Sequence, residues 1–148
     1  MPSTWKTPGE KPLDQEMTAT KNATKVMLVD DNPIILELLQ EGIEPLAETS
    51  AFHDPVVALA HCFEGLPDLV ICDYRMPGLD GLELIQKLKA RPGGDTMRVM
   101  VMAAKADIDE KLRPIADMVE EFVVKPFFVK DLAGRAKKVL DRIYWEKM

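Results

Sequence analysis

Three aspartates and one lysine stand at the ends of short hydrophobic runs in this sequence. Asp30 and Asp31 follow Val-Met-Leu-Val, Asp73 follows Leu-Val-Ile-Cys, and Lys125 comes directly after Phe-Val-Val. If these runs are parallel strands, their carboxyl ends converge on one crevice, which is where open α/β folds bind ligands. Three carboxylates and one ammonium gathered there would suit a divalent cation together with a phosphoryl group.

The elements that would position these residues alternate along the chain. Continuous apolar runs and one weaker, more polar run predict strands at 26–29, 47–52, 69–72, 99–102 and 122–124. The more polar run, 47–52, is expected at an edge of the sheet. Helical patterns are predicted after Asn32, over 55–63, after the loop 76–81, over 107–117 and from Val129 onward. The alternation favours a doubly wound parallel sheet.

Two polar residues are expected to cap helices. Asn32, followed by Pro33, suits the start of the first helix, and Asp80 suits the start of the helix after the loop. Apolar spacing in the first helix predicts one buried side, made of Ile34, Ile35, Leu38, Leu39 and Ile43.

Composition limits the class of protein. The chain has 148 residues, 47% hydrophobic and 30% charged, as expected for one globular domain. Residues 1–24 are rich in Pro, Thr, Lys and Glu and are predicted to be a disordered tail, which leaves 25–148 as the domain. The net charge of −6 argues against nucleic acid or an anionic membrane surface as a direct partner.

The cysteines and the lengths of the apolar runs indicate where in the cell the protein is located. A disulfide framework is not expected from Cys62 and Cys72, and Cys72 lies in an apolar run where an inert buried thiol is predicted. This usage fits a reducing cytoplasm. No apolar stretch is long enough to span a bilayer, and the amino terminus lacks the apolar core of a signal peptide. We therefore predict a cytoplasmic protein with no membrane partner.

Three motifs in register carry a resemblance to a known family. They are Asp30-Asp31, Asp73-Tyr-Arg-Met-Pro-Gly-Leu-Asp-Gly and Lys125-Pro-Phe. Together they resemble the receiver domain of two-component response regulators, the CheY-like family, over the whole chain except the first 24 residues or so. The resemblance implies a (βα)5 flavodoxin-like fold with a five-stranded parallel sheet of order 2-1-3-4-5. It also implies a cis peptide bond before Pro126.

The resemblance further assigns roles within the crevice. It implies Mg²⁺ held by Asp30, Asp31, Asp73 and the backbone carbonyl of Arg75, with Asp73 as the phosphoacceptor and Lys125 as a second positive centre. The implied phosphodonor is a histidine kinase or a histidine phosphotransfer protein. The chain is not expected to be an enzyme, and its chemistry should be at most its own phosphorylation and dephosphorylation. The surface of the last helix could then contact a downstream protein or a second copy of the chain.

The sequence departs from the family pattern at the fourth strand. Relatives place Thr or Ser there, and this chain has Ala103, which lies 30 residues after Asp73 and 22 before Lys125. In relatives, this hydroxyl binds a phosphoryl oxygen and an aromatic residue in the fifth strand then swings into the vacated space. Phe122 occupies the position of that aromatic residue. A lost hydrogen bond to a charged group costs roughly 1.5–3 kcal/mol, so transmission of the signal to the outer face is expected to be weaker. Phosphorylation of Asp73 could survive, because the nucleophile, the metal ligands and Lys125 remain. Met118, where relatives often carry Gly, indicates an altered turn.

Several alternatives stay open. Asp30, Asp31, Asp73 and Lys125 could be helix caps and solvated side chains with no shared role. The chain could be a pseudo-receiver that acts as a phosphorylation-independent interaction module, or a regulatory fragment of a longer response regulator. A haloacid-dehalogenase-like phosphohydrolase fits poorly, because Arg75 stands where that family needs a second aspartate. Finally, Arg75 and Lys105, each two positions past a site residue, could flank the phosphoryl group and set its lifetime.

Overall fold

The structure, a computed structural model, describes residues 24–148. The tail predicted for residues 1–24 therefore lies outside the described residues, except for Thr24. Thr24 is buried, and its carbonyl accepts a hydrogen bond from the Glu48 N–H at 3.0 Å.

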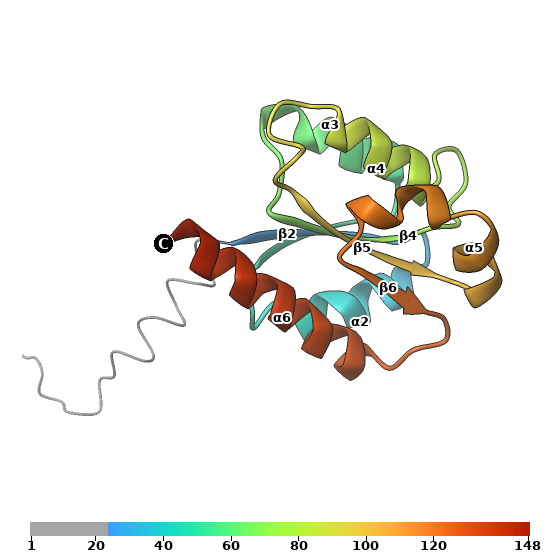
Figure 1. The fold of residues 1–148 in the computed structure, drawn as a ribbon. Coiled ribbons are helices and arrows are strands. Elements are labelled where there is room, and N and C mark those ends of the chain that lie inside the picture. Colours follow the sequence, from blue (N-terminus) through green and yellow to red (C-terminus); the bar gives the residue numbers. More distant parts are fainter. Residues whose placement is uncertain (1–23) are drawn as a thin grey trace, which may run out of the picture.

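One parallel sheet forms the centre of the described part of the chain (Figure 1). Its strands are β2 (Lys25–Val29), β3 (Glu48–Phe52), β4 (Leu69–Asp73), β5 (Arg98–Ala103) and β6 (Glu121–Val124). They lie side by side in the order β3-β2-β4-β5-β6, all parallel. This is the order 2-1-3-4-5 of the flavodoxin-like receiver fold, which confirms the predicted fold class and the edge position of the more polar strand.

Helices cover both faces of this sheet. They are α2 (Pro33–Ile43), α3 (Pro55–His61), α4 (Gly81–Lys89), α5 (Lys105–Glu110) and α6 (Val129–Lys147), with 3₁₀ turns at Cys62–Glu64 and Arg113–Met118. Figure 1 shows α3 and α4 on one face and α2 and α6 on the other. Among the described helices, none is both long and apolar enough to cross a membrane.

Alternation along the inner strands divides the core between the two faces. In β2, Val26 and Leu28 pack with α2 and α6, whereas Met27 and Val29 pack with α3 and α4. Because both faces are covered, these strands are apolar throughout instead of alternating with polar residues. Cys72 of β4 is fully buried in the second of these clusters, as predicted, and burial raises the pKa of its thiol.

The buried side of α2 differs from the predicted one. Leu36, Leu39 and Ile43 are buried, while the Ile34 side chain is 68% exposed and that of Leu38 is 43% exposed. The reason is the packing of α2 on α6, which comes so close at Gly42 that a Cβ there would lie 2.9 Å from Val129 Cγ1. This contact sets the rotation of α2 about its axis, and the apolar spacing alone could not reveal it.

The prediction of one helix over 107–117 is also wrong in its bounds. The structure has α5 at Lys105–Glu110 and a separate 3₁₀ turn at Arg113–Met118. Pro114 explains the interruption, because proline lacks an N–H and disfavours the helical conformation in the residue before it.

Candidate functional site

The first pair of acidic residues lies where β2 ends and α2 begins. Asp30 is buried, and its N–H continues the ladder by donating to the Phe52 carbonyl at 3.2 Å. The Asn32 side chain accepts hydrogen bonds from the N–H groups of Ile34 and Ile35, which confirms its predicted capping role. The Asn32 N–H donates to Asp30 Oδ1 at 2.9 Å. The helix cap thus also holds the Asp30 carboxylate in place.

Asp73 is the last residue of β4 and is 4% exposed. The Tyr74 N–H donates to the Met102 carbonyl at 2.9 Å, so the chain stays on β5 for one more residue before it turns. The loop then returns, because the Gly81 N–H donates to the Tyr74 carbonyl at 2.8 Å. A Cβ at position 81 would lie 2.4 Å from the Asp73 carbonyl oxygen, so only glycine fits there.

Gly81 is a further positioning residue, one that the sequence pattern alone does not single out. Gly81 is the last residue of the motif that begins at Asp73, and its place directly after the capping residue Asp80 is the only sign of this role in the sequence. The structure confirms that Asp80 caps α4, in a capping box with Glu83. The start of α4 is therefore held directly against the end of β4, next to Asp73.

Lys125 reaches the same place from β6. Its Nζ lies 2.7 Å from Asp73 Oδ1, and its N–H donates to the Ala103 carbonyl at 2.9 Å. The peptide bond between Lys125 and Pro126 is cis, as predicted. The Lys125–Asp73 ion pair therefore joins the end of β6 to the end of β4, with β5 lying between these two strands in the sheet.

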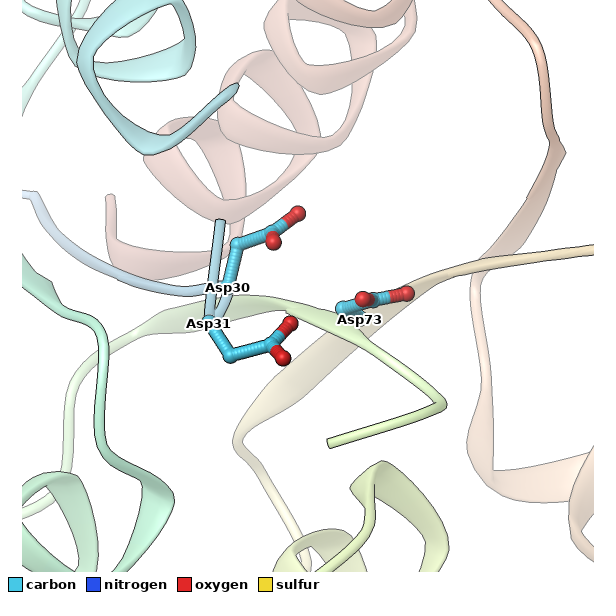
Figure 2. A group of neighbouring side chains, drawn as sticks. All are labelled: Asp30, Asp31 and Asp73. Carbon is cyan, nitrogen blue, oxygen red and sulfur yellow. The ribbon is translucent and has the colours of Figure 1, made fainter. Parts of the chain in front are cut away.

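The three carboxylates gather as the strand pattern predicted. Oxygens of Asp30, Asp31 and Asp73 all lie within 4.8 Å of one another. Figure 2 shows Asp30 and Asp31 extending from the end of β2 to the side on which Asp73 lies. Asp31 is exposed, whereas the other two are buried. The site is therefore open to solvent on one side and enclosed on the other.

The charges of this cluster are not balanced by the described residues around it. Burial, which outweighs the Asn32 hydrogen bond, raises the pKa of Asp30 to about 6. Burial also raises the pKa of Asp73, against the opposing effect of Lys125. Asp30 Oδ2 is buried and has no hydrogen-bond partner among the described residues. An orphaned carboxylate oxygen beside two more carboxylates fits a hard divalent cation such as Mg²⁺.

The two cations expected to flank a phosphoryl group have other partners here. Arg75 Nε and Nη2 donate to the two Asp107 oxygens at 2.8 and 2.7 Å, and these hydrogen bonds hold the pKa of Asp107 below its usual range. Lys105 Nζ lies 3.0 Å from Asp109 Oδ2 within α5. Asp107 could not be found from the sequence, because no pattern links it to an arginine 32 residues earlier.

Ala103, where the family pattern predicts Thr or Ser, has a well-defined place in the sheet. Ala103 ends β5, is 3% exposed and is paired with Val124 of β6. Phe122 is half-buried and packs against the cluster that contains Ala103. The site therefore has no side-chain oxygen from the end of β5.

Comparisons with known proteins agree with this geometry. Residues 26–137 match the response regulator receiver domain family. The chain is a receiver domain of that family. The phosphate regulon transcriptional regulatory protein PhoB of Rhizobium meliloti is 31% identical over 119 residues, which cover 80% of this chain and 52% of PhoB. The cyclic di-GMP phosphodiesterase response regulator RpfG of Xanthomonas campestris is 31% identical, over 78% of this chain and 31% of RpfG.

A solved structure gives the same result for this receiver domain. The signal receiver domain of a signal transduction histidine kinase from Syntrophus aciditrophicus matches with a TM-score of 0.71 and 26% identity, over 81% of this chain and 92% of that one. The receiver domain spans about half or less of the length of the two curated relatives. Membership of the family implies phosphoacceptor signalling as part of a two-component system, and receiver domains are signalling domains that are generally not enzymes.

Proposed function

We propose that Asp73 accepts a phosphoryl group from a phosphohistidine side chain of a histidine kinase or histidine phosphotransfer protein, in a Mg²⁺-dependent reaction. The observation that carries this proposal is the Lys125–Asp73 pair at 2.7 Å beside the orphaned oxygen of Asp30. A buried nucleophilic carboxylate, one ammonium and an incomplete set of oxygen ligands together match the needs of phosphoryl transfer.

The proposed step forms one bond and breaks another. An Asp73 carboxylate oxygen attacks phosphorus, the P–N bond to the donor imidazole breaks, and the ring nitrogen keeps its electron pair. The product is an acyl phosphate on Asp73. The Lys125 ammonium starts hydrogen-bonded to the attacking group and can direct a second N–H to a phosphoryl oxygen, which stabilises the charge that develops there.

The residues that would hold the metal ion are those of the acidic cluster. Asp30, Asp31 and Asp73 would supply carboxylate oxygens, and the family pattern adds the backbone carbonyl of Arg75. When bound, Mg²⁺ offsets the negative charge of the cluster and of the incoming phosphoryl group. Asp30 is already oriented for this role by the Asn32 N–H, so little reorganisation is needed.

Exposed apolar side chains on the elements that leave the site favour a protein as phosphodonor. Ile34 and Leu38 lie on α2, which follows the acidic pair, and Phe128, 78% exposed, lies three residues after Lys125. Such side chains on neighbouring elements are typical of a surface that contacts a protein. A small-molecule donor alone would not need them.

A second candidate function is a phosphorylation-independent interaction module. The buried Ala103 favours it, because no hydroxyl is available to pull the end of β5 toward a phosphoryl oxygen. Exposed Trp145 near the end of α6 would then belong to a surface for a downstream protein or a second copy. The two functions differ in whether the site binds a phosphoryl mimic.

The test uses beryllofluoride, a phosphoryl mimic, with Mg²⁺. Calorimetry on the wild type is expected to show saturable, Mg²⁺-dependent binding, and an acyl-phosphate donor is expected to add one phosphoryl group by intact mass. Asp73→Asn should abolish both, whereas Asp95→Asn, a change in the exposed turn before β5, should abolish neither. Failure of the wild type to bind the mimic would favour the interaction module.

A further inference from the structure

An ion pair joins the loop after the proposed phosphoacceptor to α5. Arg75 presents two N–H groups to both oxygens of Asp107, at 2.8 and 2.7 Å, in the forked geometry that gives Arg–carboxylate pairs their strength and direction. The two partners differ in their surroundings. The Arg75 side chain is 67% exposed, while that of Asp107 is 9% exposed.

The rest of α5 is weakly anchored. The helix has six residues, all described, and Asp107 is the only one among them that is buried. Its N-cap, Ala104, makes no side-chain hydrogen bond to the first turn. Ile108 is half-buried against the core. The Arg75–Asp107 pair is therefore a principal side-chain link between the first turn of α5 and the remainder of the domain.

This pair lies close in sequence to two positions of the site. Arg75 comes two residues after Asp73, and α5 begins two residues after Ala103. An acyl phosphate at Asp73 would carry about two negative charges in place of one and would offer three acceptor oxygens. The largely exposed guanidinium of Arg75 would then have two alternative anionic partners, the phosphoryl group and Asp107.

We propose that Arg75 is a phosphate-responsive latch: it holds α5 through Asp107 in the unphosphorylated protein and leaves Asp107 when a phosphoryl group forms on Asp73. Release of Asp107 frees the first turn of α5 and changes the surface that α5 presents. This route does not use a hydroxyl at the end of β5, which the chain lacks at Ala103. The inference rests on the proposed function, since it needs a phosphoryl group at Asp73.

Hydrogen–deuterium exchange of peptides that span 104–112 tests the latch, with beryllofluoride and Mg²⁺ present or absent. In the wild type, the mimic is expected to speed exchange of these amides by roughly three- to fivefold, the upper part of the range for one partly exposed ion pair. Asp107→Asn should show fast exchange without the mimic and no further response. Asp109→Asn removes the neighbouring pair within α5, with Lys105, and should respond as the wild type does.

Affinity for the mimic separates a latch from a merely structural contact. Asp107→Asn frees Arg75 permanently, so its affinity for beryllofluoride should rise by roughly three- to fivefold, whereas Arg75→Gln should lower it. If the contact only stabilised α5, the two substitutions would change the affinity for beryllofluoride in the same direction.

The outcomes are distinguishable from a failure of the proposed function. If the wild type does not bind beryllofluoride, both proposals are overturned. If it binds and exchange in 104–112 stays unchanged, or if Asp107→Asn keeps a full response, the latch alone is overturned and Asp73 remains a phosphoacceptor.

Discussion

Lys125 Nζ and Asp73 Oδ1 lie 2.7 Å apart, although 52 residues and two helices separate them in the chain. The Asp73 side chain is almost fully buried, whereas that of Lys125 is about one-third exposed. The pair neutralises one of three negative charges, which leaves the cluster suited to a further cation.

Lys125→Met should weaken both stability and chemistry. Without the ammonium, Asp73 stays buried without its charged partner, which we expect to cost about 1–3 kcal/mol in the free energy of unfolding without metal. Added Mg²⁺ should recover part of this loss. The rate of phosphorylation by an acyl-phosphate donor should fall about a hundredfold, as for loss of one donor to a transition-state oxygen. Lys130→Met, at an exposed position in the first turn of α6, is the control; equal losses in both variants would contradict this role.

The stability of the metal-free protein should depend on pH through Asp30. Its pKa is raised from 3.8 to about 6 by burial, so the folded state binds this proton more tightly than the unfolded chain does. Stability should therefore decrease as the pH rises from about 4 through about 6, the reverse of the usual effect of a carboxylate.

Urea unfolding with a chelator present measures this dependence. Asp30→Asn should be more stable than the wild type at neutral pH, and the difference should vanish below about pH 3, where Asp30 is protonated in both the folded and the unfolded state. Added Mg²⁺ should reverse the order, because only the wild type gains the full stabilisation from binding the ion. A stability difference independent of pH would show that Asp30 is not the titrating group.

Gly81→Ala should damage the site through the backbone. The new Cβ would lie 2.4 Å from the Asp73 carbonyl oxygen and 3.0 Å from Tyr74 Cα, and neither atom can move without shifting the end of β4. We expect a loss of about 2 kcal/mol or more in stability and weaker binding of beryllofluoride. Gly134→Ala in α6, where nothing lies within 4 Å, should instead gain about 0.5–1 kcal/mol. Similar effects of the two changes in thermal unfolding would refute the close approach.

Ala103→Thr should place a hydroxyl at the end of β5, as the family pattern predicts. The larger side chain enters a buried position, so we expect about 1–2 kcal/mol of destabilisation without ligand. With Mg²⁺, affinity for beryllofluoride should rise about tenfold, because the hydroxyl can donate to a charged oxygen. Ala103→Val is the control, because valine has nearly the same volume as threonine but carries no hydroxyl. If calorimetry gave the valine variant the same gain, packing and not hydrogen bonding would explain it.

The amino-acid sequence by itself determined the alternation of strands and helices, the family and the meeting of the acidic residues. Apolar runs that end in Asp30, Asp31 and Asp73 bring these carboxylates together, because the carboxyl ends of parallel strands lie at the same edge of the sheet. Capping by Asn32 and Asp80 was also predictable, since it depends on neighbours within three residues.

Only the tertiary structure decided which partner each side chain meets across elements. The rotation of α2 depends on the close contact of Gly42 with Val129, and the place of Arg75 depends on a carboxylate in α5. Periodicity shows that a helix has an apolar side, but the neighbouring helix sets which residues turn inward. The pairing of Arg75 with Asp107 likewise follows from long-range packing, which brings together charges whose separation in the sequence carries no signal.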